Sequence, residues 1–289
     1  MKCFYHSADL DGKCSGAIVR HEFPDCEMIG INYGQPFPWD RIEPGELIFM
    51  VDFSLPIADM KRLNELACLT WIDHHKTALE EAARESFTAR NHKLEIGRAG
   101  CELTWEYLHA TLQEIPRAVF LLGRYDVWRH HEHPGALEFQ YGMRMHDCSP
   151  ENKMLWDILL DAETDILLVD QIIDTGETLL EYERRQNDIY ITALGFDVEW
   201  EGLRFIAVNK GLVSSLLFAS VWDPGKYDAM LSFYRNRHGS WTVSVYTDTA
   251  GIDASAICKR HGGGGHVGAA GFQCDELPFL GGPDKGSKW

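Results

Sequence analysis

Four short segments in the first half of the chain carry the residue types best suited to metal chemistry. They read HSADLDG, VDFS, TWIDHH and YDVW. Imidazole and carboxylate ligands together suit borderline divalent ions, with Mn²⁺ the natural choice and Mg²⁺, Co²⁺ or Fe²⁺ as alternatives. Two such ions roughly 3.5–4 Å apart, sharing one carboxylate, can clamp a phosphate and deprotonate a water. The residues concerned are His6, Asp9, Asp11, Asp52, Asp73, His74, His75 and Asp126.

The elements around these segments alternate between strands and helices. Alternation with short connections predicts a parallel sheet covered by helices. The carboxyl ends of parallel strands form the edge where such folds build their sites, and three of the four segments follow predicted strands. The strands are predicted at 2–6, 27–32, 46–52 and 68–73, and the helices at 12–22, 56–66, 100–112 and 115–125.

A plainer role is open to individual aspartates. Asp9 and Asp52 follow strands, where Asp is a common helix N-cap. A bare carboxylate at the end of an apolar strand is costly unless it is paired or bound to metal. Four clusters of this kind in one half of the chain therefore favour a metal site over capping alone.

The second half of the chain has a different pattern. Residues 151–194 are predicted to be helical almost throughout and to connect a first domain (1–150) with a second (195–277). The second domain is predicted to have a mixed sheet, with a hairpin turning at Glu201-Gly202, and the tail 278–289 is predicted to be loose. Its strands are predicted at 196–200, 204–208, 228–234, 241–246 and 269–272, and its helices at 213–219 and 254–260.

A glycine-rich stretch, HGGGGHVGAAGF, runs from residue 261 to 272. Glycines permit positive φ and close approach of a ligand to the backbone, and their N–H groups can form an anion-binding concavity. His266 follows directly and could hydrogen-bond a phosphate. A flexible linker is the alternative, but a predicted helix and a predicted strand frame the run closely.

Bulk properties narrow the class of protein. The chain has 289 residues, a net charge of −17 and eight cysteines. No Cys-x-x-Cys pair occurs, which predicts reduced, mostly buried thiols in a cytoplasmic protein. No apolar run is long enough to span a membrane, so no membrane partner is expected. The acidity argues against binding of long duplex nucleic acid and favours a small or short phosphate substrate.

The four segments, in this order, resemble the motifs of the DHH phosphoesterase superfamily. The stretch IDASAICKRHGGGGHVGAAGF resembles the DHHA1 domain that accompanies it. The stretch VDFSLPIADMKRLNEL, followed by WIDHHKTA, resembles especially the short DHH enzymes that degrade very small RNAs, the nanoRNases. The resemblance implies an α/β fold with an N-terminal parallel-sheet DHH domain and a smaller C-terminal DHHA1 domain with a mixed sheet. It also implies metal-dependent hydrolysis of a phosphodiester.

The resemblance further implies a role for each residue. His6, Asp9 and Asp52 would hold one ion, and Asp11, Asp52, His74 and Asp126 the other, with Asp52 as the bridge. His75 would face the scissile phosphate, and Asp73 would orient the histidines. Gly263, Gly264 and His266 would bind the terminal phosphate or nucleotide. Arg98, at the start of a predicted helix, could hold a phosphate, or could be a plain surface arginine.

The predicted substrate is a short oligonucleotide or a dinucleotide, degraded from one end to nucleoside monophosphates. A cyclic dinucleotide phosphodiesterase and a 3′-phosphoadenosine 5′-phosphate phosphatase are alternatives. An inorganic pyrophosphatase is disfavoured by the GGGGH run, and a non-catalytic nucleotide sensor is disfavoured by the intact ligand set. RNA or DNA preference, and assembly into a homodimer, are left open.

Overall fold

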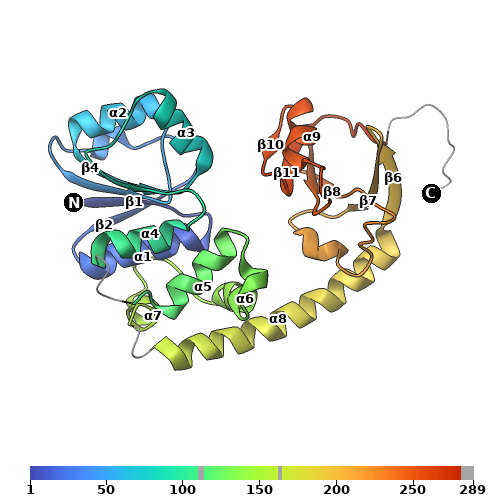
Figure 1. The fold of residues 1–289 in the computed structure, drawn as a ribbon, viewed down its shortest axis with the longest axis horizontal. Coiled ribbons are helices and arrows are strands. Elements are labelled where there is room, and N and C mark those ends of the chain that lie inside the picture. The colour runs from blue at the N-terminus through green and yellow to red at the C-terminus, as the bar shows by residue number, and fades with distance from the viewer. Residues whose placement is uncertain (110–113, 162–164, 281–289) are drawn as a thin grey trace. The chain divides into compact units, whose positions relative to one another are not determined.

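The computed structural model describes residues 1–109, 114–161 and 165–280 (Figure 1). The chain divides into two compact units, Met1–Leu180 and Glu181–Trp289. The division falls within the long helix α8 (Asp165–Leu194). The predicted connector contains two helices, since α7 (Lys153–Leu159) ends before α8 begins. Most of the predicted loose tail, residues 281–289, lies outside the described residues.

The first unit is built on a five-stranded parallel sheet in the order β2-β1-β3-β4-β5. Strand β1 is buried on both faces of the sheet. Phe4 belongs to an apolar cluster on one face, and Cys3 and Tyr5 belong to another apolar cluster on the opposite face. Near-continuous apolar runs are expected for strands covered on both faces. The strands are β1 (Lys2–His6), β2 (Glu27–Ile31), β3 (Leu47–Val51), β4 (Cys68–Asp73) and β5 (Asn91–Leu94).

Helices cover both faces of this sheet (Figure 1). Helices α2 (Ile57–Leu66) and α3 (Lys76–Arg84) pack on the Phe4 face. The helices of the opposite layer are α1 (Leu10–Glu22), α4 (Gly100–His109), α5 (Arg117–Asp126), α6 (Ala136–Met143) and α7. The parallel α/β fold predicted for this half of the chain is confirmed.

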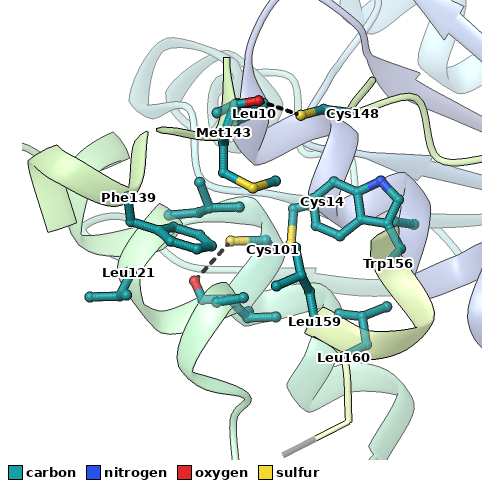
Figure 2. Close-up of a cluster of buried hydrophobic side chains, with 14 of the residues drawn as sticks. Leu10, Cys14, Cys101, Leu121, Phe139, Met143, Cys148, Trp156, Leu159 and Leu160 are labelled. Carbon is teal, nitrogen blue, oxygen red and sulfur yellow. Dashed lines mark hydrogen bonds between the residues drawn. The ribbon is translucent and has the colours of Figure 1, made fainter. Parts of the chain in front are cut away.

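A compact apolar cluster joins the helices of this second layer (Figure 2). Cys14 of α1, Cys101 of α4 and Trp156 of α7 all lie in it and are almost fully buried. The thiol of Cys101 donates to the carbonyl of Val119 at 3.5 Å. Six of the eight cysteines are buried and all eight are free, as predicted for reduced thiols.

One strand and two α-helices of the first unit were not predicted, nor were its short 3₁₀ helices η1 (Trp39–Arg41) and η2 (His130–Glu132). Strand β5 reads NHKL, and a four-residue polar edge strand gives no alternation long enough to recognise. Helices α3 and α6 are short, and α6 begins directly after Gly135 in a histidine- and proline-containing loop. The predicted helix at 100–112 is α4, whose last predicted residues fall outside the described part of the chain.

The second unit contains a six-stranded mixed sheet in the order β10-β11-β9-β8-β7-β6. Only the β7–β8 pair is parallel. Glu201 and Gly202 both have positive φ in the predicted β6–β7 hairpin, as a type I′ turn requires. The elements are β6 (Phe196–Trp200), β7 (Leu203–Asn209), the 3₁₀ helix η3 (Ser215–Phe218), β8 (Ala229–Arg235), β9 (Trp241–Tyr246), α9 (Ala254–Arg260), β10 (Gly264–Gly265) and β11 (Ala269–Cys274).

Among the described helices, none has the length and apolar character needed to cross a bilayer.

The crossing of α6 and α8 gives a testable prediction about stability. A Cβ on Gly176 would lie 1.7 Å from the carbonyl oxygen of Glu138, so the two backbones touch. In a helix exposed to solvent, Gly→Ala stabilises by roughly 0.5–1 kcal/mol. Here overpacking outweighs that gain, and Gly176→Ala is expected to lower the free energy of unfolding by about 1–3 kcal/mol in urea titrations. The control is Thr175→Ala on the exposed side; equal stability of the two variants would contradict this packing.

Candidate metal centre and glycine hairpin

The register of the sheet brings three of the sequence segments to one edge. Tyr5 pairs with Val51, and Val51 pairs with Ile72. The next residue along each of these strands is therefore His6, Asp52 or Asp73 respectively. Three adjacent parallel strands thus place an imidazole and two carboxylates side by side at their carboxyl ends.

Three overlapping groups of side chains at this edge could each hold a metal ion. The potential ligand atoms within each group lie within 4.8 Å of one another. Asp52 belongs to two of the groups and His74 to two, so the groups are contiguous. They are His6, Asp9 and Asp52; Asp52, His74 and His75; and Asp11, His74 and Asp126. The structure thus brings together every metal-ligand candidate that the sequence suggested.

Asp52 lies at the centre of this arrangement and is almost completely buried. Its φ is +53°, a left-handed conformation that is uncommon for a residue other than glycine. Its backbone N–H donates to the carbonyl of Ile72 at 2.8 Å, which holds the strained turn against β4. The carboxylate of this residue is shared by two of the three metal groups.

The carboxylate of Asp52 can occupy its position because residue 100, at the start of α4, is a glycine. A Cβ on Gly100 would lie 2.7 Å from the Cβ of Asp52 and 2.8 Å from its Oδ1. No side chain could therefore be placed at residue 100 without moving Asp52. Sequence reasoning considered Arg98 in GRAGCELTW and missed Gly100; the small residues after Arg98 are the signal that could have indicated it.

The two aspartates of the first segment, Asp9 and Asp11, are each held by the N-terminus of a helix. Asp9 caps α1, its Oδ1 accepting from the N–H of Gly12 at 2.9 Å, while its Oδ2 lies 2.7 Å from His6 Nδ1. Asp11 is buried, and its two oxygens accept from the N–H groups of Gly100 and Cys101 at 2.7 Å each. Capping and metal binding are therefore compatible roles for one carboxylate, since each oxygen carries more than one lone pair.

Asp73 makes the contacts that an orienting residue needs. Its Oδ1 lies 2.7 Å from His75 Nδ1 and accepts from the backbone N–H groups of His74 and His75. Its Oδ2 accepts from the indole N–H of Trp71 at 3.3 Å. Asp73 is fully buried and absent from the three metal groups. Burial lowers the pKa of His75, but the Asp73 carboxylate outweighs this effect and raises it overall.

The carboxylates are crowded enough to repel one another. Burial, followed by the charge of Asp11, raises the pKa of both Asp52 and Asp126 well above the ordinary range. Burial lowers the pKa of His6, yet the neighbouring carboxylates of Asp52 and Asp9 raise it to about 10. These shifts have a common cause, namely several negative charges gathered in a space of low polarity.

Two buried atoms support the assignment of a cation to this space. His6 Nδ1 and Asp52 Oδ1 are buried, and neither makes a well-aligned hydrogen bond among the described residues, although His6 Nδ1 lies 2.7 Å from Asp9 Oδ2. His74 Nε2 lies 3.2, 3.3 and 3.6 Å from oxygens of Asp52, Asp126 and Asp11. Buried polar atoms without hydrogen bonds require another partner. The donor set, imidazole nitrogen with carboxylate oxygen, fits a divalent metal of the borderline class.

Arg98 is engaged with a residue outside the metal groups. Its Nη2 lies 2.5 Å from Glu106, which also pairs with Lys93 at 2.9 Å. This ion pair raises the pKa of Arg98 and lowers that of Glu106. The structure therefore shows Arg98 tied to α4, and its role in phosphate binding stays a prediction.

The glycine run forms a hairpin instead of an open loop. Gly264 and Gly265 make the short strand β10, paired with Gly271 and Ala270 of β11. The approach of the two backbones leaves no room for a larger residue before this strand, because a Cβ on Gly263 would lie 2.1 Å from the carbonyl oxygen of Gly271.

Among the four consecutive glycines 262–265, Gly264 differs from the others in two respects. Its φ lies outside the left-handed region, and no atom lies within 4 Å of the place where a Cβ would be. His266, at the turn, is exposed, and its backbone N–H donates to the carbonyl of Ala269 at 2.8 Å. Gly263, Gly264 and His266 all belong to the second unit, where their substrate-binding role stays a prediction.

No protein-family model matches the sequence, and no curated protein matches it significantly. Solved structures do share the fold. One is the DHH domain of a protein described as a member of a family of ribosomal proteins. It is 14% identical, with a TM-score of 0.59 over 94% of this chain and 82% of that chain. Another is PggH, a pGpG-specific phosphodiesterase from Vibrio cholerae. It is 13% identical, with a TM-score of 0.54 over 94% of this chain and 92% of that chain. The chain therefore shares its fold with a solved DHH domain, as its motifs indicated.

Metal binding at this edge is expected to depend on pH. Because the pKa values of Asp52 and Asp126 are raised, the folded chain holds protons above pH 3.8 that the unfolded chain releases, and stability falls as pH rises. The raised pKa of His6 also stabilises the folded chain. This stabilisation is complete below pH 6.5 and is lost as pH approaches about 10. Chelator-treated protein should therefore lose thermal stability between about pH 6 and pH 8.

A cation must displace these protons, so the rise in Tm caused by Mn²⁺ should be larger at about pH 8 than at about pH 6. Differential scanning fluorimetry with Mn²⁺ and with chelator measures this difference. A Mn²⁺ effect that weakens as pH rises would contradict the site.

Asp73→Asn tests the orienting contact separately. The amide keeps the size of the side chain but has no charge and only one accepting oxygen, so it cannot keep both the contact with His75 and that with Trp71. Loss of such a supporting carboxylate typically costs 10- to 100-fold in metal affinity or activity. Isothermal titration with Mn²⁺ gives the affinity, and Asp25→Asn at an exposed position is the control. An unchanged affinity with unchanged turnover would show that Asp73 is only structural.

Proposed function

We propose that this protein is a metal-dependent phosphodiesterase that hydrolyses short oligonucleotides or dinucleotides to nucleoside monophosphates. The observation that supports this most directly is the set of three contiguous histidine and aspartate groups sharing Asp52 and His74. A buried carboxylate common to two groups is what a bridging ligand between two ions requires. Mn²⁺ is the proposed metal because the donor set is mixed.

The proposed division of the ligands is the one that the motif resemblance implies. His6, Asp9 and Asp52, which form one of the three groups, would hold one ion, and Asp11, Asp52, His74 and Asp126 would hold the other. When bound, the ions supply a water of lowered pKa and charge to neutralise the phosphate. The chain itself orients His75 through Asp73, which engages Nδ1 and leaves Nε2 for a phosphate oxygen. The raised pKa of His75 favours the protonated form that can donate to this oxygen.

The substrate class is proposed from charge and from the glycine hairpin. A net charge of −17 disfavours long polyanions, and a hairpin with open space at Gly264 and an exposed His266 suits one terminal phosphate. The shared fold of a pGpG-specific phosphodiesterase makes pGpG the first dinucleotide to test. A cyclic dinucleotide and 3′-phosphoadenosine 5′-phosphate are the alternative substrates, and pyrophosphate is the least favoured.

Asp52→Asn is the decisive variant. It retains shape but removes the negative charge shared by two groups, so turnover should fall by at least about 10³-fold while the fold is kept. The purified protein is incubated with Mn²⁺ and labelled 2- to 24-nucleotide RNAs and DNAs, pGpG, cyclic dinucleotides, 3′-phosphoadenosine 5′-phosphate and pyrophosphate. Asp25→Asn, at an exposed position, is the matched control and should behave as the parent protein.

Each class of product decides between the candidates. Nucleoside monophosphates from the shortest oligonucleotides support the proposal. Cleavage of pyrophosphate alone would overturn it. Nucleotide binding by the parent protein with no metal-dependent turnover of any substrate would instead establish a nucleotide sensor.

A further inference from the structure

Tyr33 lies in a tight turn beside the metal groups. The turn is closed by the N–H of Gln35, which donates to the carbonyl of Asn32 at 3.1 Å. The side chain of Gln35 accepts from the N–H of Asn32 at 3.0 Å. Gly34 follows Tyr33 with a φ of +84°, the conformation that the third residue of a type II turn requires. The backbone at Tyr33 is therefore held in place next to the carboxyl end of β2.

The ring of Tyr33 packs on three rings of the candidate metal centre. It lies against Phe53 with centroids 4.6 Å apart, and it meets His6 at 5.5 Å and His75 at 6.2 Å, edge to face. Phe53 is buried and directly follows Asp52. The position of the ring is thus fixed relative to the residues proposed to bind metal.

The same side chain is 55% exposed. Neither usual role of a tyrosine explains this combination. A core tyrosine is largely buried, and a surface tyrosine is not held by three other rings. A fixed aromatic face open to solvent, beside the candidate metal centre and the histidine proposed to face the phosphate, is the arrangement found where proteins stack nucleobases.

We propose that Tyr33 is a stacking platform for the nucleobase of the nucleotide whose phosphate is bound at the metal centre. This inference rests on the proposed function and adds the part of the substrate that the metal site does not contact. Stacking on an aromatic face tolerates any base, since every base has a π-face. The platform therefore provides affinity for nucleotides over other phosphate compounds without selecting a sequence.

A second role for Tyr33 would use its hydroxyl as a proton donor to the leaving group. The two roles separate by substitution. Tyr33→Phe and Tyr33→Trp keep an aromatic face, whereas Tyr33→Leu keeps bulk without one. Tyr182→Ala is the matched control, because Tyr182 is 64% exposed and makes no ring contact among the described residues.

The test measures kcat and KM with Mn²⁺ for a dinucleotide and for the same compound in which one nucleotide lacks its base. Tyr33→Leu should lower kcat/KM for the intact dinucleotide by roughly 5- to 150-fold, mainly through KM, the range for loss of one stacked base. It should change kcat/KM for the abasic compound by less than about twofold. Tyr33→Phe, Tyr33→Trp and Tyr182→Ala should stay within about threefold of the parent protein.

Two results would overturn the proposal. If Tyr33→Phe loses kcat as fully as Tyr33→Leu, the hydroxyl and not the ring is what matters. If Tyr33→Leu weakens the abasic and intact compounds equally, the ring supports the metal centre and does not contact a base.

A binding measurement separates this inference from the proposed function. Affinities for GMP, AMP and ribose 5-phosphate are measured by titration in the presence of Mn²⁺. Absence of turnover in the parent protein refutes the proposed function, whereas a preference for GMP and AMP over ribose 5-phosphate that Tyr33→Leu abolishes still supports stacking. Equal affinities for the three compounds in the parent protein refute stacking.

Discussion

The contact between the Asp11 carboxylate and the N-terminus of α4 is the interaction on which the candidate site depends. A helix N-terminus presents free N–H groups and a partial positive charge, so it favours an ionised carboxylate. Asp11 uses both oxygens on Gly100 and Cys101. These two hydrogen bonds join α1 to α4 and hold Gly100 close to Asp52. The close approach of Gly100 in turn fixes the position of Asp52 at the centre of the metal groups. Asp11 is also the neighbour whose charge most raises the pKa of Asp52 and Asp126.

A buried ion pair supports the same end of α4. Arg124 Nη2 lies 2.7 and 2.5 Å from the two oxygens of Glu102, and both side chains are buried. Glu102 also accepts from the N–H of Ala99 at 3.2 Å, in the first turn of α4. Because Asp126 lies two residues after Arg124, the pair ties the end of α5 to the start of α4. Removing one partner of such a buried pair is strongly destabilising, because the other charge is left buried and uncompensated.

The strands that end at the site could be predicted because their apolar runs stop abruptly at His6, Asp52 and Asp73. The parallel order and the meeting of those ends then follow from general rules of α/β folds. The left-handed φ of Asp52 could not be predicted, since it depends on the neighbouring strand and on Gly100. The strand pairing of Gly264 and Gly265 was missed for a related reason. Glycine has weak preferences of its own, and contact with β11 decides its conformation.

Helix α8 has a consequence for how this chain can be divided. Val169 and Ile172, near its start, belong to the apolar cluster of the first unit, and Ile191, near its end, belongs to a cluster of the second. A cut at the boundary between Leu180 and Glu181 would therefore fall inside a hydrogen-bonded helix. Recombination that exchanges one unit for that of another protein must carry the helix whole or rebuild its missing half. Each unit has its own sheet, but both units include part of the single helix α8.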